Sequence, residues 1–328
     1  MRFIEFPEPY TPTALLYGTH GGEKVDLLRV VAQFSEDTLE QIEEALEILS
    51  PLVLESRRAY MHAAAIEMVE LTDVAKQEIL DGEMPRMGHR SQATLHHRVT
   101  LTLVAFCSLQ AFEQEETLKK IERENGVDSR EWTRAKAIYH YLFDENLGYR
   151  ILAKLRNILH HESMQVVNAK NSSWMEGPEK KNLLEFRINR QLMMKSRHVN
   201  KKLKSNLSSL PEDPRVEELI YQSLQGLTMA SYELKPLMNK KYDWARDVLF
   251  ELESNFVGCK GYRMLAETFP EKPEGNEIEW PQFQIIPPEI LRESVGPRPV
   301  LRSKRFQSIP QFDPRNFARE IQNISSGP

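Results

Sequence analysis

The strongest constraint on the fold of this chain is a helical period in its apolar residues, which runs with interruptions through residues 35–161. In the first stretch, apolar side chains recur at spacings of three and four residues, at Leu39, Ile42, Leu46 and Leu49. That spacing places them on one face of an α-helix. Because several such stretches follow one another, the chain is predicted to be mainly α-helical.

Capping residues and glycines divide this part of the chain into predicted helices. Ser35 caps the first, and Ser50 followed by Pro51 predicts the start of a second, because proline is favoured at the first helical position. Asp128 with Glu131 resembles a capping box at the start of a fourth. The predicted helices span residues 35–49, 51–80, 91–125, 130–143 and 145–161.

A change of period predicts a β-hairpin at about residues 164–194. The segments MQVVN and LLEFRIN alternate apolar and polar side chains, so Leu184, Phe186 and Ile188 would share one face. Further helices are predicted from about residue 198 to residue 256.

Prolines and glycines set the predicted domain limits. Residues 1–34 hold three early prolines and a glycine cluster, and are predicted to be irregular. Ten of the nineteen prolines fall after residue 269, so residues 261–328 are predicted to be an extended or disordered tail that docks through Trp280 and Phe283. Residues 35–260 are predicted to be one helical domain that contains the hairpin.

Composition excludes several classes of protein. The two cysteines, Cys107 and Cys259, cannot form a disulfide scaffold or a Cys-rich zinc site. The N-terminus lacks the features of a signal peptide, and no run of 18 apolar residues occurs, so we expect a cytoplasmic protein without a membrane partner. No glycine-rich nucleotide motif or H-E-x-x-H is present, and His96–His97 lack an acidic or cysteine partner. We therefore expect no cofactor and no metal.

The segment LAKLRNILHHES, residues 152–163, carries the most chemistry. On a helical wheel its apolar residues form one face, and the opposite arc presents Arg156, Asn157, His160 and His161. Histidine exchanges protons near neutral pH and arginine binds phosphate oxygens, so together they can cleave RNA without a metal. The alternative is a solvated helix end, where basic side chains complement the helix dipole.

These residues resemble the signature helix of the HEPN superfamily, in which an arginine is followed after four to six residues by a histidine and often directly by asparagine. Arg156, Asn157 and His161 match that pattern. The same bare spacing at Arg57/His62 lacks the asparagine. The stretch from about residue 90 to residue 235 also resembles bacterial HEPN proteins of the abortive-infection type, in which the signature helix precedes a hairpin and a charged helix.

The resemblance implies a HEPN-like helical bundle that forms a homodimer, with a composite cleft that cuts RNA without a metal. His161, with His160 as second choice, would be the acid/base, Arg156 would bind phosphate and Asn157 would shape the site. Many relatives are toxins or anti-phage effectors, so an antitoxin or a defence-complex protein is an expected partner. Some relatives only bind, and the alternative is a non-catalytic scaffold for nucleotide, RNA or a partner protein.

A local block of positive charge follows the signature segment. Residues 179–204 carry nine basic and two acidic side chains, in a chain with a net charge of −5. This block predicts an RNA-binding groove. Its predicted members are Lys180, Lys181, Arg187, Arg190, Lys195, Arg197, Lys201 and Lys202, with Lys204 at the end of the block. The alternative is a solvated helix face with strand-edge lysines, and Trp174 and Phe186 are predicted either to stack on bases or, more simply, to pack.

Overall fold

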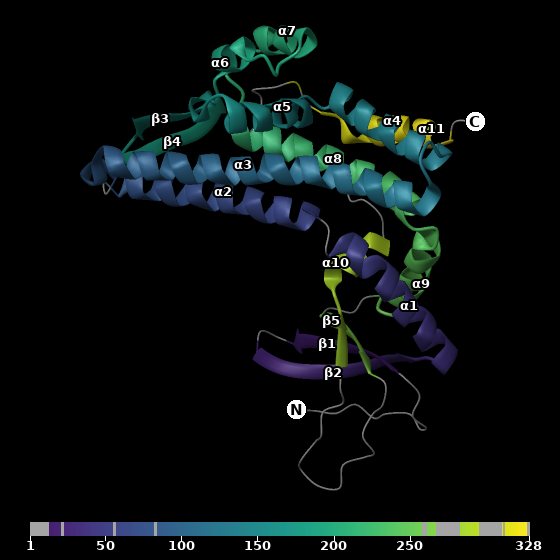
Figure 1. Cartoon of the computed structure of the whole chain (residues 1–328). Helices are drawn as coiled ribbons and strands as arrows, with labels where there is room; N and C mark the ends of the chain where they lie inside the picture. Colours follow the sequence, from purple (N-terminus) through teal and green to yellow (C-terminus); the bar gives the residue numbers. More distant parts are fainter. Residues whose placement is uncertain are drawn as a thin grey trace. The chain divides into compact units, whose positions relative to one another are not determined.

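The computed structural model describes residues 13–20, 23–54, 57–81, 84–257, 261–266, 283–294, 310 and 312–326. The chain divides into two units, the first comprising 1–55 and 239–297 and the second 56–238 and 298–328. Most described residues lie in helices, which confirms the predicted mainly α class (Figure 1). None of the helices that the structure describes is both long and apolar enough to cross a bilayer.

In its described residues, the first unit combines a four-stranded sheet with three helices. The antiparallel strands lie in the order β2-β1-β5-β6. Its elements are β1 (Thr13–His20), β2 (Glu23–Gln33), α1 (Glu36–Val53), α9 (Tyr242–Ser254), β5 (Tyr262–Ala266), β6 (Phe283–Ile286) and α10 (Pro288–Ser294). Helix α1 packs on α9 through buried side chains such as Leu46, Leu49 and Leu249.

The irregular segment predicted over residues 1–34 is wrong for its described part, because β1 and β2 pair there. The three early prolines all precede Thr13, and Gly21 and Gly22 separate the two strands in sequence, so neither strand is interrupted by proline. The single helical domain predicted over 35–260 is also wrong, since α1 and α9 belong to the first unit. Ser35 caps α1 as predicted, but α1 continues through Pro51 to Val53.

The second unit is a helical bundle that carries a two-stranded sheet. Its elements are α2 (Arg57–Leu80), α3 (Met84–Asn125), α4 (Arg130–Glu145), α5 (Leu147–His161), the 3-10 turn η1 (Met164–Val166), β3 (Val167–Glu176), β4 (Glu179–Ile188), α6 (Arg190–Lys195), α7 (Lys201–Ser209), α8 (Val216–Met238) and α11 (Pro314–Ser326). Helices α2 and α3 lie side by side, and α8 packs against α5, α4, α3 and α11 (Figure 1). The predicted cap at Asp128 is corrected to Ser129, whose side chain accepts from the Trp132 amide, while Asp128 itself has φ +59°.

The extended or disordered tail predicted over 261–328 is wrong where the structure describes it. Strands β5 and β6 complete the sheet of the first unit, and α11 packs on α4 and α8 in the second. Phe317 and Ile321, one turn apart on α11, are both buried, and the Phe317 ring stacks on Tyr141 at 5.3 Å between centroids. The predicted docking residue Trp280 lies outside the described residues.

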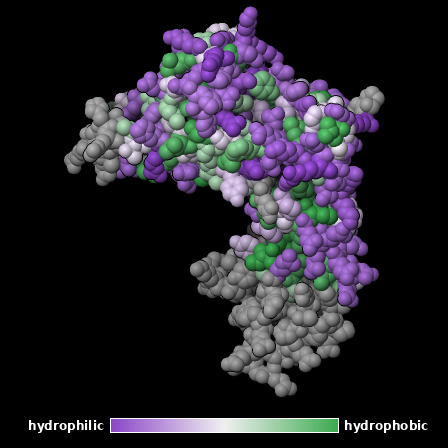
Figure 2. Space-filling model, viewed as in Figure 1, coloured by the Kyte–Doolittle hydropathy of each residue, from purple (hydrophilic) through white to green (hydrophobic). Residues whose placement is uncertain are grey.

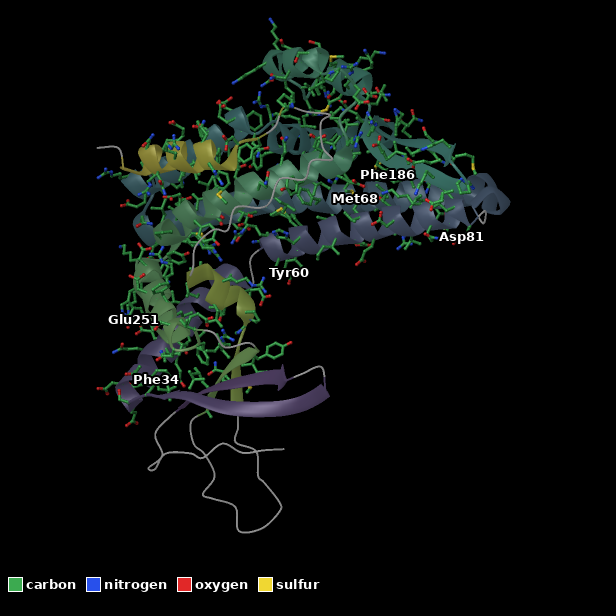
Figure 3. The ribbon with its side chains drawn as sticks, turned by 180° about the vertical axis from the view of Figure 1, so that it is seen from behind. Phe34, Tyr60, Met68, Asp81, Phe186 and Glu251 are labelled. Carbon is green, nitrogen blue, oxygen red and sulfur yellow. The ribbon has the colours of Figure 1, made fainter. Side chains whose placement is uncertain are left out.

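The hairpin is confirmed, with β3 pairing antiparallel to β4 from Val167–Ile188 to Glu176–Glu179. Leu184, Phe186 and Ile188 are all buried, as the alternating pattern predicts. Strand β4 packs against α2, and Figure 3 labels the buried Met68 of α2 and Phe186 of β4. Phe186 is 3% exposed, so it packs and is not available to stack on a base.

Candidate functional site on helix α5

Helix α5, which carries the signature residues, is anchored at its start by a buried asparagine. The Asn146 side chain accepts a hydrogen bond from the Tyr149 amide at 2.8 Å and donates one to the Gln222 carbonyl of α8 at 2.7 Å. Gly148 permits a close approach of the two helices, since a Cβ there would lie 2.7 Å from the Leu219 carbonyl oxygen. The start of α5 is therefore tied closely to the centre of the bundle.

The predicted two-sided character of α5 is observed. Leu152, Leu155 and Ile158 are buried in the core of the second unit. On the other side, Arg156 and Asn157 are half-buried, whereas His160 and His161 are exposed. The two histidines occupy the last turn of α5, where the negative end of the helix dipole favours positive charge.

Arg156 and His160, one turn apart, lie along α3. The Arg156 guanidinium carbon is 5.6 Å from the centre of the Phe112 ring, and Phe112 is 45% exposed. Nε2 of His160 lies 3.4 Å from Oγ of Ser108. Burial raises the pKa of the nearby Cys107 thiol and so disfavours the thiolate form, against the smaller effect of the Arg156 charge.

His161 lies on the other side of the exposed arc, beside the connection between α6 and α7. Its ring centre is 6.1 Å from that of His198, with the planes tilted by 39°, and 6.2 Å from that of His160. Nε2 of His198 is 3.7 Å from Oε1 of Glu162, the C-cap residue of α5. Three imidazoles and one carboxylate thus gather at the end of α5.

The second arginine of α5 has a structural role. Arg150 is 4% exposed, and its Nε donates to the Phe143 carbonyl at 2.8 Å. Its guanidinium also donates to the Asp144 carbonyl and contacts Asn206 of α7. Burial lowers the pKa of Arg150, opposed by the neighbouring carboxylates. Arg156, by contrast, is half-buried and lies beside an aromatic ring.

The predicted RNA-binding block divides into two parts, and the first is engaged within the protein. Arg187 is 6% exposed and pairs with Glu185 at 2.6 Å and with Glu212 at 2.5 Å, which corrects the prediction that it lines a groove. The other four members of this part also contact groups within the protein. Lys180 donates to the Ile79 carbonyl, Lys181 pairs with Glu179, Arg190 contacts the Leu210 carbonyl and Asp213, and Lys202 pairs with Asp144.

The second part is the α6–α7 basic cluster, which we define as Lys195, Arg197, Lys201 and Lys204. Three of these side chains are exposed and Lys204 is half-buried, and none forms an ion pair within the described part of the chain. The surface over α6 and α7, at the top of Figure 2, is mostly hydrophilic. His198 lies in the same segment, so these cations flank the imidazole that neighbours His161.

Sequence reasoning missed four residues of this site: Ser108, Phe112, Glu162 and His198. Ser108 and Phe112 come from α3, and their one-turn spacing matches that of Arg156 and His160, but nothing in the sequence pairs these two helices in register. His198 lies within the basic block, where a histidine among lysines and arginines is the one available signal. Trp174, predicted either to stack on a base or to pack, is 47% exposed on β3.

Comparison with protein-family models, with curated proteins and with solved structures finds no match for this chain. Among the described residues, no three His, Cys, Asp or Glu side chains are grouped as metal ligands. Of the histidine pair considered for a metal, His96 contacts the Val167 carbonyl through Nε2 at 2.7 Å. The site is therefore defined by its own geometry: an arginine, an asparagine and three imidazoles at one end of an anchored helix.

Proposed function

We propose that this protein is a metal-independent endoribonuclease of a bacterial anti-phage defence or toxin system, and that it acts in the cytoplasm as a HEPN-like homodimer. The observation that carries this proposal is the exposed arc of α5. The half-buried Arg156 and Asn157 and the exposed His160 and His161 lie opposite the buried face of the helix, and His198, which neighbours His161, comes from the connection that also carries Arg197 of the α6–α7 basic cluster.

The chemistry follows from the side chains. An imidazole, assigned to His161, takes the proton of a ribose 2′-hydroxyl, and the oxygen attacks the adjacent phosphorus. The bond to the 5′-oxygen breaks, leaving a 2′,3′-cyclic phosphate. The departing oxygen takes a proton from solvent, and His161 returns to solvent the proton that it accepted. The Arg156 guanidinium stabilises the negative charge that develops on the phosphate oxygens. No step needs a metal or a cofactor.

A second copy of the chain is part of the proposal, because the two key residues diverge within one copy. Arg156 contacts Phe112 of α3, whereas His161 contacts His198 on the other side of α5. Residues five apart on a helix are separated by roughly 140° around its axis. Arg156 of one copy and His161 of the other are then placed on one phosphate by a two-fold axis near α5.

The test incubates the purified protein with tRNA and total RNA in EDTA. We expect fragments with cyclic-phosphate ends, and Arg156→Ala and His161→Ala should each lower cleavage by at least about 100-fold while leaving circular dichroism and dimerisation unchanged. His62→Ala, in the Arg57/His62 pair of identical spacing on α2, is the matched control and should retain full activity.

Mixing the two inactive variants tests the composite cleft. A dimer of Arg156→Ala with His161→Ala keeps one Arg156 and one His161 on different copies, so activity should return if the pair acts across the dimer. Full activity of both single variants, or no recovery in the mixture, would contradict the corresponding part of the proposal. Binding of RNA without fragments would favour the non-catalytic scaffold.

A further inference from the structure

We propose that His198, held by Glu162, is a positioning residue that fixes the orientation of the His161 imidazole. The effect of His198 on catalysis rests on the proposed function, but the claim that His198 fixes the His161 ring does not. The observation is that an imidazole from the α6–α7 connection lies 6.1 Å from the His161 ring, at a tilt of 39°. That separation is within the range of contact between aromatic rings.

The His198 ring is itself restrained. Its Nε2 atom is enclosed by protein, has no hydrogen-bond partner among the described residues, and lies 3.7 Å from Oε1 of Glu162, an ion-pair distance when the imidazole is protonated. Glu162 directly follows His161 and caps α5 through a hydrogen bond from its backbone to the Ile158 carbonyl. The carboxylate nearest to the His198 Nε2 in this ion-pair contact therefore belongs to the same helix end as His161.

The backbone around His198 is also held. Ser196 and Val199, on either side of it, are 3% and 4% exposed, and the His198 amide donates to Oγ of Ser196 at 3.0 Å. Further along, Asn200 caps α7 through a bond from the Leu203 amide at 2.9 Å. At the other end of α6, the Asn189 amide donates to the Val166 carbonyl at 2.7 Å, just after α5. The connection is thus attached at several points near the end of α5.

His161, by contrast, is exposed at the last residue of its helix, where a side chain has few neighbours on its own element. A catalytic base must stay close to one geometry, because a displacement of about 1 Å can cost on the order of 100-fold in rate. The enclosed Nε2 of His198 faces Glu162 and not the surface, so His198 is suited to hold its neighbour and not to exchange protons with substrate.

The first test needs no RNA. Histidine-labelled protein is examined by ¹H–¹³C NMR, and His161→Ala assigns the Cε1–H signal of His161. We expect His198→Ala to move and broaden that signal, and Glu162→Ala to do so to a smaller extent. His198→Phe, which keeps a flat ring, should restore a sharp signal. The matched control is His140→Ala, an exposed histidine on α4, which should leave the His161 signal in place.

The second test is kinetic. His198→Ala should lower kcat by about 10- to 100-fold with KM changed by less than about twofold, and His198→Phe should recover most of the loss. A His161 signal that is unmoved by His198→Ala in a folded variant overturns the inference, whatever the activity. If the native protein cleaves no RNA, the proposed function fails, and the NMR result alone decides whether His198 positions His161.

Discussion

Replacing Arg187 by methionine should destabilise the second unit without weakening RNA binding. Arg187 belongs to the basic block by sequence, but its guanidinium makes two hydrogen bonds to Oε2 of Glu185, at 2.9 and 2.6 Å, and donates to the Asp213 carbonyl at 3.0 Å. It also pairs with Glu212, whose pKa is lowered chiefly by that bond. Methionine keeps the length of the side chain and removes the charge.

The size of the effect follows from burial. Arg187 and Glu185 are each 6% exposed, and breaking a buried ion pair by removing one partner costs about 3–5 kcal/mol, because the other charge stays buried. Arg215, at 3.0 Å from Glu185, still compensates part of that charge, which places the expected loss at the lower end of this range. The Glu212 side chain is 43% exposed, so its pair with Arg187 adds at most about 1 kcal/mol.

Urea denaturation followed by ¹⁹F NMR of fluorotryptophan at Trp174, on the same hairpin, measures the loss. With an m-value of about 2 kcal/mol/M, the midpoint should fall by about 1.5–2 M. The double variant Glu185→Met with Arg187→Met should recover much of the stability, because no buried carboxylate is left unpaired. A single variant within about 1 kcal/mol of the native protein, or one that weakens RNA binding at unchanged stability, would refute this account of Arg187.

Three further predictions concern separate parts of the second unit. Alanine at Lys195, Arg197, Lys201 and Lys204 together should leave the urea midpoint unchanged and lower the salt dependence of binding to single-stranded RNA. The slope of log affinity against log salt should fall by up to about 0.7 for each phosphate that the variant no longer neutralises. Filter binding in a cleavage-deficient background measures this slope. Gly148→Ala should lower the melting temperature, because its Cβ would lie 2.7 Å from the Leu219 carbonyl oxygen and 2.8 Å from Cβ of Gln222. Overpacking costs about 1–3 kcal/mol, against about 1 kcal/mol gained in helix propensity. A higher melting temperature would therefore contradict the tight α5–α8 contact. Burial raises the pKa of Glu217 above its ordinary 4.5, so ionised Glu217 costs stability at neutral pH. Glu217→Gln should therefore stabilise at pH 7, and the difference should vanish below about pH 4.5, where the carboxyl is protonated in both states; a difference that persists well below that pH would show another cause.

The helices and the hairpin were predictable because their signals are local. The period of Leu39, Ile42 and Leu46 reports α1, and the alternation of Leu184, Phe186 and Ile188 reports β4. The sheet of the first unit was not predictable in this way. Strand β1 pairs with β5, which lies more than two hundred residues further along the chain, and no local pattern records such a pairing.

Only the residues of the candidate site that lie on α5 were predictable from the sequence. The helical wheel placed Arg156, Asn157, His160 and His161 on the arc opposite the apolar face, because residues on one helix keep fixed angular positions. It could not supply Phe112 or His198, which approach from other elements. The count of charges, in turn, treated every cation between residues 179 and 204 alike. Whether an arginine pairs internally depends on carboxylates such as Glu212, which only the fold brings beside it.

The two sides of α5 differ in a way that bears on how an RNA strand would lie. On the side of His161 stands His198, in the connection that also carries Arg197 of the α6–α7 basic cluster, and cations on a surface favour the sugar–phosphate backbone. On the side of Arg156 stands Phe112, 45% exposed, and an exposed ring favours a base, which can stack on it while the guanidinium binds phosphate. If the proposed function holds, the backbone therefore crosses near α6 and α7 while a base rests against α3. The cluster would then set affinity and its salt dependence, and Phe112 would set which nucleotide is cut.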